Sequence, residues 1–147
     1  MIATPSTTRQ YCTFRLAHYH CGIAVESVHE ILNRHDMTHV PLAPSIVAGL
    51  INLRGQILIA MDLRARMGFP KRDADRQPVI IVVEDGEADV CTALLVDEIG
   101  DVIEVDPGDC ESPPPAIDAH HRELIQQVCK RDQGLLMILH AGNTTQF

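Results

Sequence analysis

The chain has 147 residues, a formal net charge of -8 and only 3% aromatic residues. This length fits one domain with a sizeable core. The acidic balance and scattered basic residues argue against a protein that binds nucleic acid through its phosphates, and the lack of tryptophan argues against a base-stacking surface. No apolar run reaches transmembrane length, so we expect no direct membrane insertion.

The cysteine pattern indicates a reducing compartment. Five cysteines form no close CxxC pair, and no apolar segment near Met1 is typical of a secretory signal. We therefore expect reduced thiols in a cytosolic protein. The cysteines are Cys12, Cys21, Cys91, Cys110 and Cys129.

The first ordered segment is predicted to be a β-hairpin. Cys12, Phe14 and Leu16 alternate with polar or aromatic residues, a period typical of a strand with one face in a core. A second short strand follows Gly22, so the hairpin covers about residues 10–25. From Val25 the spacing fits either one turn of helix or the start of a strand, and both interpretations stay open.

Residues 40–44 (VPLAP) are expected to be extended because each proline excludes its predecessor from the helical region. The next segment, SIVAGL, predicts a short helix that begins near Ser45 and ends at Gly49 in the left-handed conformation. Its role would be to deliver the chain into the following hairpin.

That hairpin, within GLINLRGQILIAMDLR at residues 49–64, organises the first half of the chain. Two apolar runs flank Arg54 and Gly55, which predicts paired strands with Arg54 at the tip. Arg54 would be strained at positive φ, so we expect a type I turn opened by Asn52 and closed by Gly55 in a G1 bulge. The arginine is either a solvated surface charge or a group that meets a partner, since its planar fork suits carboxylates and carbonyls.

After the hairpin, Asp62 is placed to cap one helical turn at residues 63–67. Residues 71–77 are mostly charged and form the predicted joint between two halves. We expect the first half to form a barrel over residues 11–70 and the second half to form a barrel over residues 78–141. The first strand could belong to both barrels.

The second half reads as strands separated by polar loops. One hairpin is predicted whose two strands flank the loop at residues 85–89. A short strand at 101–105, a surface loop with four prolines and a final hairpin over 123–140 follow it. Residues 141–147 are expected to fray. The predicted fold is therefore mainly β, with about ten short strands in two small five-stranded barrels and only short helical segments.

The sequence contains no pattern typical of a catalytic residue, a phosphate loop or a bound cofactor. One alternative function is a metal-binding or thiol-based sensor using Cys12, His18, His20 and Cys21, which a hairpin can bring together. Their spacing is unlike that of a closed zinc site, so we expect no metal. Rigid hairpins without such a site are typical of a binding module.

Four segments together resemble the CheW-like chemotaxis coupling proteins. They are VHEI at residues 28–31, VPLAPSIVAGLINLRGQIL at 40–58, MDLRARMG at 61–68 and LLVDEI at 94–99. The resemblance covers nearly the whole chain, and the whole of residues 1–147 reads as a single domain of this kind. It implies two five-stranded SH3-like barrels, a cytoplasmic location at receptor arrays and no catalytic activity.

The resemblance also implies partners. Such adaptors join the tip of a methyl-accepting chemoreceptor to the regulatory domain of a CheA-type histidine kinase, or serve a non-flagellar chemosensory pathway. Glu30 and Arg54 match family positions that support this coupling, and Asn52 lies beside them. The resemblance places a receptor-binding groove between the barrels and the kinase contact at the barrel ends. Val28, Ile31 and Val96 are candidate contributors to these two surfaces.

Three departures from the family pattern concern partner contacts. Ile59 and Ala60 replace a more usual Pro-Val pair, His140 replaces a frequent aspartate, and the last seven residues, AGNTTQF, are short and polar. We expect the hairpin corner to be preserved and the C-terminal surface to differ.

Overall fold

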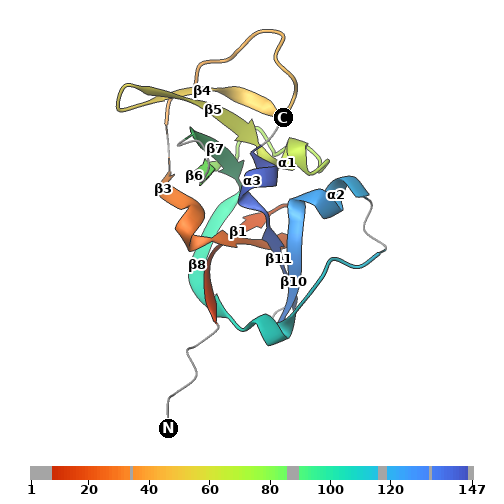
Figure 1. Ribbon diagram of the computed structural model, residues 1–147. Helices are drawn as coiled ribbons and strands as arrows, with labels where there is room; N and C mark the ends of the chain where they lie inside the picture. Colours follow the sequence, from red (N-terminus) through yellow and green to blue (C-terminus); the bar gives the residue numbers. More distant parts are fainter. Residues whose placement is uncertain (1–7, 34, 86–89, 116–118, 133, 146–147) are drawn as a thin grey trace.

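The structure is a computed structural model that describes residues 8–145 except 34, 86–89, 116–118 and 133 (Figure 1). In this part of the chain the fold is mainly β, as predicted, with two sheets and short helices. The expected loop at residues 85–89 lies largely outside the described residues. Asp62 caps a helical turn as expected, since its carboxylate accepts a hydrogen bond from the Arg64 N–H at 3.1 Å.

Two sheets, one above the other in Figure 1, account for all the named strands. One has the order β8-β1-β2-β11-β10-β9 and contains β1 (Arg9–Leu16), β2 (Tyr19–Ala24), β8 (Glu98–Val105), β9 (Cys110–Glu111), β10 (Ile125–Arg131) and β11 (Gly134–Leu139). The other has the order β3-β6-β7-β5-β4 and contains β3 (Val28–Leu32), β4 (Val47–Leu53), β5 (Gln56–Asp62), β6 (Val79–Asp85) and β7 (Val90–Val96). The short helices are α1 (Leu63–Arg66), α2 (Ala119–Leu124) and α3 (Ala141–Thr144), with 3₁₀ turns at Val25–Ser27 and Pro107–Asp109.

The two sheets do not follow the expected division at residues 71–77. The hairpin β1–β2 comes from the first half of the chain but lies in the six-stranded sheet, and β6–β7 comes from the second half but lies in the five-stranded sheet. The β1–β2 hairpin joins its sheet by antiparallel pairing of β1 with β8 and parallel pairing of β2 with β11. The β6–β7 hairpin does so by antiparallel pairing of β6 with β3 and parallel pairing of β7 with β5. Such pairs join distant segments, so no local pattern in the sequence announces them.

The buried apolar residues form three clusters. One lies between the two sheets, one is formed by strands of the five-stranded sheet, and one by strands of the six-stranded sheet. Phe14 and Leu16 of β1 are fully buried in the cluster between the sheets, together with Met61 and Leu94. The opposite face of β1 carries Tyr11 into the core of the six-stranded sheet. The predicted alternation along β1 is therefore confirmed, but both of its faces are covered. Burying a side chain as large as Phe14 contributes about 2–3 kcal/mol.

The segment before the central hairpin is a strand, so the expected helix at SIVAGL is wrong. β4 begins at Val47, and Gly49 lies inside it, where an added Cβ would come within 2.6 Å of the Thr38 carbonyl oxygen. Thr38 forms an isolated bridge with Leu50. Gly49 is thus required for a close backbone approach and does not end a helix.

The last described residues are ordered, so the expected frayed end is wrong up to residue 145. Residues 141–144 form α3, Thr144 is buried, and the helix packs against β6. His140 caps this helix, since its Nδ1 accepts a hydrogen bond from Asn143 N at 3.2 Å. The His140 side chain thereby supplies the acceptor at the N-cap position of this helix.

Two of the five cysteines are joined, so the expectation of five reduced thiols is wrong. Cys110 of β9 and Cys129 of β10 form a disulfide, with their Cα atoms 4.0 Å apart. They lie directly opposite each other in the β9–β10 pair. They are 19 positions apart in the sequence, and strand pairing brings them together. Cys12, Cys21 and Cys91 are not part of a disulfide.

Candidate functional site

The corner of the β4–β5 hairpin is a two-residue turn. Leu53 pairs with Gln56, and between them Arg54 and Gly55 have φ values of 53° and 85°. Positive φ at both positions is typical of a type I′ turn, so the expected type I turn with a G1 bulge is wrong. This turn type matches the twist of the paired strands, and that gain outweighs the strain at Arg54. The Asn52 side chain supports the turn by accepting a hydrogen bond from Gly55 N at 3.1 Å.

Arg54 at this corner forms a bidentate ion pair with Glu30 of β3. Arg54 Nη1 lies 2.7 Å from Glu30 Oε1, and Arg54 Nη2 lies 2.9 Å from Glu30 Oε2. The Arg54 side chain is 71% exposed, whereas that of Glu30 is 20% exposed. Two of the five guanidinium N–H donors bind Glu30, so the others are available to a partner.

The ion pair connects the two edges of the five-stranded sheet. β3 and β4 are its outer strands, and the chain between them runs past β4. There Thr38 bridges Leu50, and His35 Nε2 lies 2.8 Å from the Asn52 carbonyl oxygen. The sheet therefore curls toward closure at the point where the sequence places its candidate contact residues.

The ion pair stabilises the charged form of both groups. Hydrogen bonding to Arg54 lowers the pKa of Glu30, and hydrogen bonding to Glu30 raises the pKa of Arg54. Both side chains are thus charged at neutral pH. The corner presents a fixed pair of opposite charges with the guanidinium outermost.

The other predicted contact residues divide by burial. Asn52 is exposed, and Ile31 of β3 is a large apolar side chain that is 40% exposed. Val28 is half-buried and packs against the core between the sheets. Val96 is fully buried in that same core, so its assignment to a surface contact is wrong. β7 is a continuous apolar run covered on both faces, and such a run does not reveal which residues reach the surface.

A second charged cluster, which the sequence did not single out, lies buried where the two sheets meet. Asp97 follows β7, and its carboxylate accepts hydrogen bonds from Arg64 Nε at 2.9 Å, from Arg72 Nε at 2.8 Å and from Ala17 N at 2.7 Å. Its side chain is only 4% exposed. Arg72 also lies 3.6 Å from Asp62. The cluster ties α1, the segment after it and the β1–β2 turn to one carboxylate.

Asp97 is held ionised by these contacts. Burial raises its pKa, but the hydrogen bonds from Arg64, Ala17 N and Arg72 outweigh burial and leave the pKa below the ordinary value. The Ala17 N–H belongs to a residue with φ 56°, a strained conformation for alanine. Asp62, Arg64 and Asp97 stand in the MDLR and LLVDEI segments, which was the one signal in the sequence that could have located them.

The residues of the alternative metal or thiol site are not assembled for that chemistry. Cys12 and Cys21 are buried in the core between the sheets, and His18 is exposed. Burial raises the pKa of both thiols, that of Cys21 to about 12. Among the described residues, no group of three or more His, Cys, Asp and Glu side chains could hold a metal ion.

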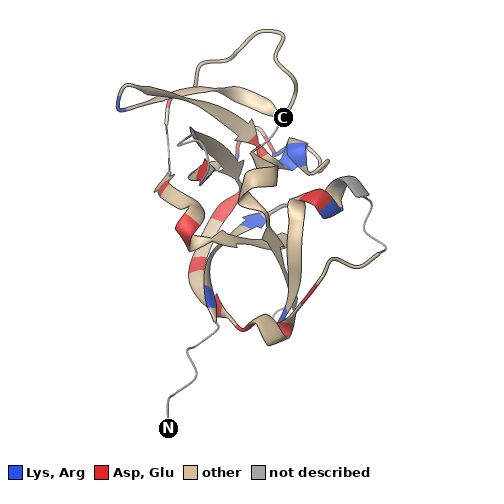
Figure 2. Ribbon diagram, viewed as in Figure 1, with Lys and Arg blue, Asp and Glu red and all other residues tan. Residues whose placement is uncertain are grey.

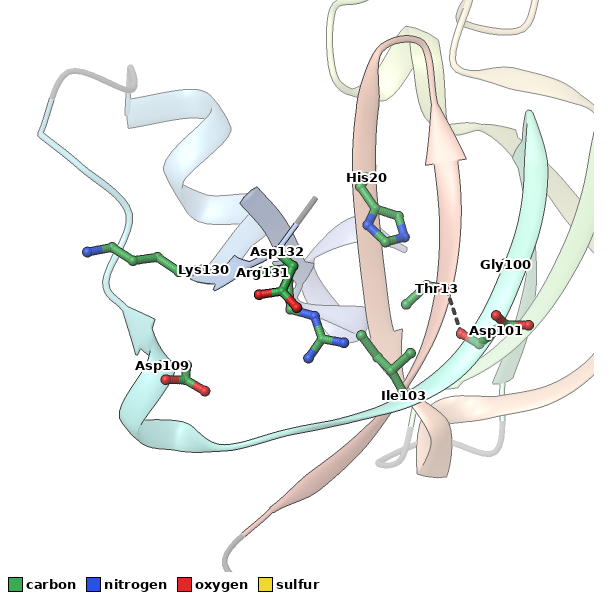
Figure 3. Close-up of a pocket in the computed structure, with 9 residues that line it drawn as sticks. All are labelled: Thr13, His20, Gly100, Asp101, Ile103, Asp109, Lys130, Arg131 and Asp132. Carbon is green, nitrogen blue, oxygen red and sulfur yellow. Dashed lines mark hydrogen bonds between the residues drawn. The ribbon is translucent and has the colours of Figure 1, made fainter. Parts of the chain in front are cut away.

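A hollow of about 500 Å³ opens on the six-stranded sheet (Figure 3). Acidic and basic groups line it together, so its charge favours neither anions nor cations. Burial, with Arg15 and Arg131 nearby, lowers the pKa of His20 at its wall. We assign no ligand to it. Its lining residues are Thr13, His20, Gly100, Asp101, Ile103, Asp109, Lys130, Arg131 and Asp132.

The surface charges are unevenly placed. Figure 2 shows acidic residues along β8 and basic residues on α1. β8 is an outer strand of its sheet, and exposed Glu98, Asp101 and Glu104 follow one another along it. Charges on an outer strand discourage pairing with other chains.

None of the helices in the described part of the chain has the length and apolar character of a membrane-spanning segment.

Comparisons with known proteins agree with this geometry. The family model of the CheW-like domain matches residues 10–146. Chemotaxis protein CheW of Bacillus subtilis is 30% identical over 97% of this chain and 90% of its own length. Chemotaxis protein CheW of Treponema pallidum is 32% identical over 88% of this chain and 78% of its own.

A solved structure has the same fold. The crystal structure of the scaffolding protein TtCheW from Thermoanaerobacter tengcongensis superimposes with a TM-score of 0.82 and 30% identity, over 96% of this chain and 94% of that one. The sheets, the hairpin corner and the family match lead to one conclusion: this chain belongs to the CheW-like domain family.

Proposed function

We propose that this chain is a non-enzymatic adaptor that couples the tips of methyl-accepting chemoreceptors to the regulatory domain of a CheA-type histidine kinase. It would act in the cytoplasm, at receptor arrays. Two relatives are named chemotaxis proteins, and the protein of similar structure is described as a scaffolding protein. Membership of the same family supports the same role here.

The observation that carries the proposal is the exposed ion pair of Arg54 and Glu30. A non-glycine residue at positive φ costs free energy, so the presence of an arginine at this corner suggests a use for its side chain. The guanidinium is 71% exposed and oriented by two hydrogen bonds to Glu30. A group fixed in this way loses little conformational freedom when a partner binds.

The surroundings of the pair suit a protein surface better than a small ligand. Ile31 lies one residue from Glu30 on β3 and is 40% exposed, and Asn52 is exposed on β4. A modest apolar contact beside an oriented charge is typical of an interface that is weak singly. In an array, many such contacts acting together would give stable association.

The test measures capture of a receptor tip and of the kinase regulatory domain by variants of the pair. Arg54→Asn removes the guanidinium and keeps a residue that tolerates positive φ, so the turn should survive. Glu30→Gln removes the charge that orients Arg54. Each variant should weaken binding of at least one partner by up to roughly a hundredfold while the thermal unfolding curve changes little.

A matched control is the ion pair of Lys130 and Glu111, which lies on the other sheet at 3.7 Å with both side chains at least 70% exposed. Lys130→Ala should leave binding unchanged. A double variant, Arg54→Glu with Glu30→Arg, separates two roles. Binding restored by the exchange indicates that the pair matters by shaping the corner, whereas continued loss indicates that Arg54 itself touches the partner. Full binding by both single variants would disprove the site.

A further inference from the structure

We propose that Cys110 and Cys129 form a reversible thiol–disulfide site that fastens β9 to the edge of the six-stranded sheet. The proposal does not depend on the adaptor function. It rests on the position of the pair, on the access to each sulfur atom, and on the burial of two of the other thiols.

The disulfide holds β9 against β10. This strand has two residues, Cys110 and Glu111, which pair with Cys129 and Val128 of β10 at the outer edge of the sheet. Glu111 is exposed, so it adds little burial to the pairing. A strand this short at an edge is marginal without another constraint. The covalent bond supplies that constraint.

Access to the two sulfur atoms is unequal. Cys129 is fully buried in the core of the six-stranded sheet with Tyr11, Leu136 and Ile138, whereas Cys110 is partly exposed at the edge. Cys110 is therefore the more accessible half of the disulfide to a thiolate from solution. The rate of thiol–disulfide exchange depends on access and on which sulfur is attacked, so we expect attack at Cys110.

The three cysteines outside the disulfide differ from the pair. Cys12 and Cys21 are buried between the sheets, and burial raises the pKa of each thiol, so they stay protonated and unreactive. Cys91 is on the other sheet, in β7. The proposed exchange therefore acts on the Cys110–Cys129 bond, with Cys91 on a different sheet and Cys12 and Cys21 buried.

The chemistry balances with glutathione as the reductant. A glutathione thiolate attacks the Cys110 sulfur, the bond between the protein sulfurs breaks, and Cys129 leaves as a thiolate that takes up a proton. A second glutathione thiolate then attacks the glutathione sulfur of the mixed disulfide and releases Cys110. Two glutathione molecules are oxidised to one glutathione disulfide, and the protein disulfide gains two electrons and two protons. Glutathione disulfide drives the reverse reaction.

Reduction should release β9 from β10. The hydrogen-bonding groups on the outer edge of β10 would then face solvent, and the segment that follows the 3₁₀ turn Pro107–Asp109 would lose its attachment. Opening of so small a unit need not disturb the rest of the sheet. The site would therefore change one edge of the molecule and leave the Arg54 corner intact.

The experiment equilibrates the full chain in glutathione buffers from fully oxidised to fully reduced and traps free thiols by alkylation for mass spectrometry. We expect Cys110 and Cys129 to become reactive together while Cys12 and Cys21 do not change. In the same samples, hydrogen exchange at the β9 amides should be at least roughly tenfold faster after reduction.

Two variants make the result decisive. Cys110→Ser should exchange at the fast rate in every buffer, and Cys91→Ser should behave as the unmodified protein. Free Cys110 and Cys129 thiols in the oxidising buffer would overturn the proposal. So would a disulfide that excess glutathione cannot reduce, or β9 exchange that is equal in both states.

Discussion

Replacing Asp97 should destabilise the protein more than any surface change. The carboxylate accepts hydrogen bonds from Arg64, Arg72 and the Ala17 N–H, and it is 4% exposed. Asp97→Ala removes the carboxylate that accepts hydrogen bonds from all three donors and that neutralises part of the charge of the two arginines. Arg64 and Arg72, whose side chains are 12% and 8% exposed, would keep their charges in a place that water barely reaches.

The expected loss can be estimated from these contacts. Removing one partner from a buried ion pair costs about 3–5 kcal/mol, because the remaining charge is left buried. Part of that loss is offset here, since Arg64 also donates to the Pro70 carbonyl at 3.1 Å and Arg72 lies 3.6 Å from Asp62. We expect about 3 kcal/mol, which for a chain of this size lowers the melting temperature by roughly 6–12 °C.

Urea unfolding followed by circular dichroism measures this loss directly. Glu98→Gln is the matched control, because Glu98 is the next residue and is exposed, so its change should stay within about 0.5 kcal/mol. A double-mutant cycle with Arg64→Met gives the coupling between the two residues. A loss below about 1 kcal/mol for Asp97→Ala, or no coupling to Arg64, would refute the role assigned to this cluster.

Three further outcomes are expected. Because contacts lower the pKa of Asp97 in the folded state, the stability difference between the protein and Asp97→Asn should be full above pH 3.8, the ordinary value, and shrink as the pH falls below it; a difference that is constant in acid unfolding titrations would contradict this. Gly49→Ala places a Cβ 2.6 Å from the Thr38 carbonyl oxygen and should cost about 1–3 kcal/mol in urea unfolding; an unchanged midpoint would show that β4 shifts freely. His140→Asp should strengthen the cap that accepts from Asn143 N and raise stability by about 0.5–1 kcal/mol, measured as a higher melting temperature; a lower one would count against the cap.

Local patterns in the sequence were sufficient for the hairpins. Alternation along β1, apolar runs on either side of Gly55 and turn residues between β10 and β11 each involve neighbours in the chain, and all three hairpins formed as predicted. The turn type at Arg54 was mispredicted because a local rule, the strain of positive φ, was outweighed by strand twist. Tertiary structure routinely overrides a preference of this size.

What depends on distant residues could not be predicted. Glu30 and Arg54 were each named from the resemblance, yet nothing in the sequence showed that they bind each other across 24 positions. The same holds for Cys110 with Cys129 and for Asp97 with Arg64. Val96 was wrongly predicted to lie at a contact surface for a different reason. A strand buried on both faces shows no alternation of apolar and polar residues, so the sequence does not indicate which side chains reach the surface.

The parallel pairing of β2 with β11 has a consequence for how the molecule is made. The two strands begin at Tyr19 and Gly134, so the six-stranded sheet stays incomplete until β11 has left the ribosome. The five-stranded sheet needs nothing beyond β7 and is available earlier. During that interval the apolar face of the β1–β2 hairpin has no C-terminal strand to cover it. Contacts this far apart in sequence slow folding, so the newly made β1–β2 hairpin stays partly uncovered until β11 pairs with β2.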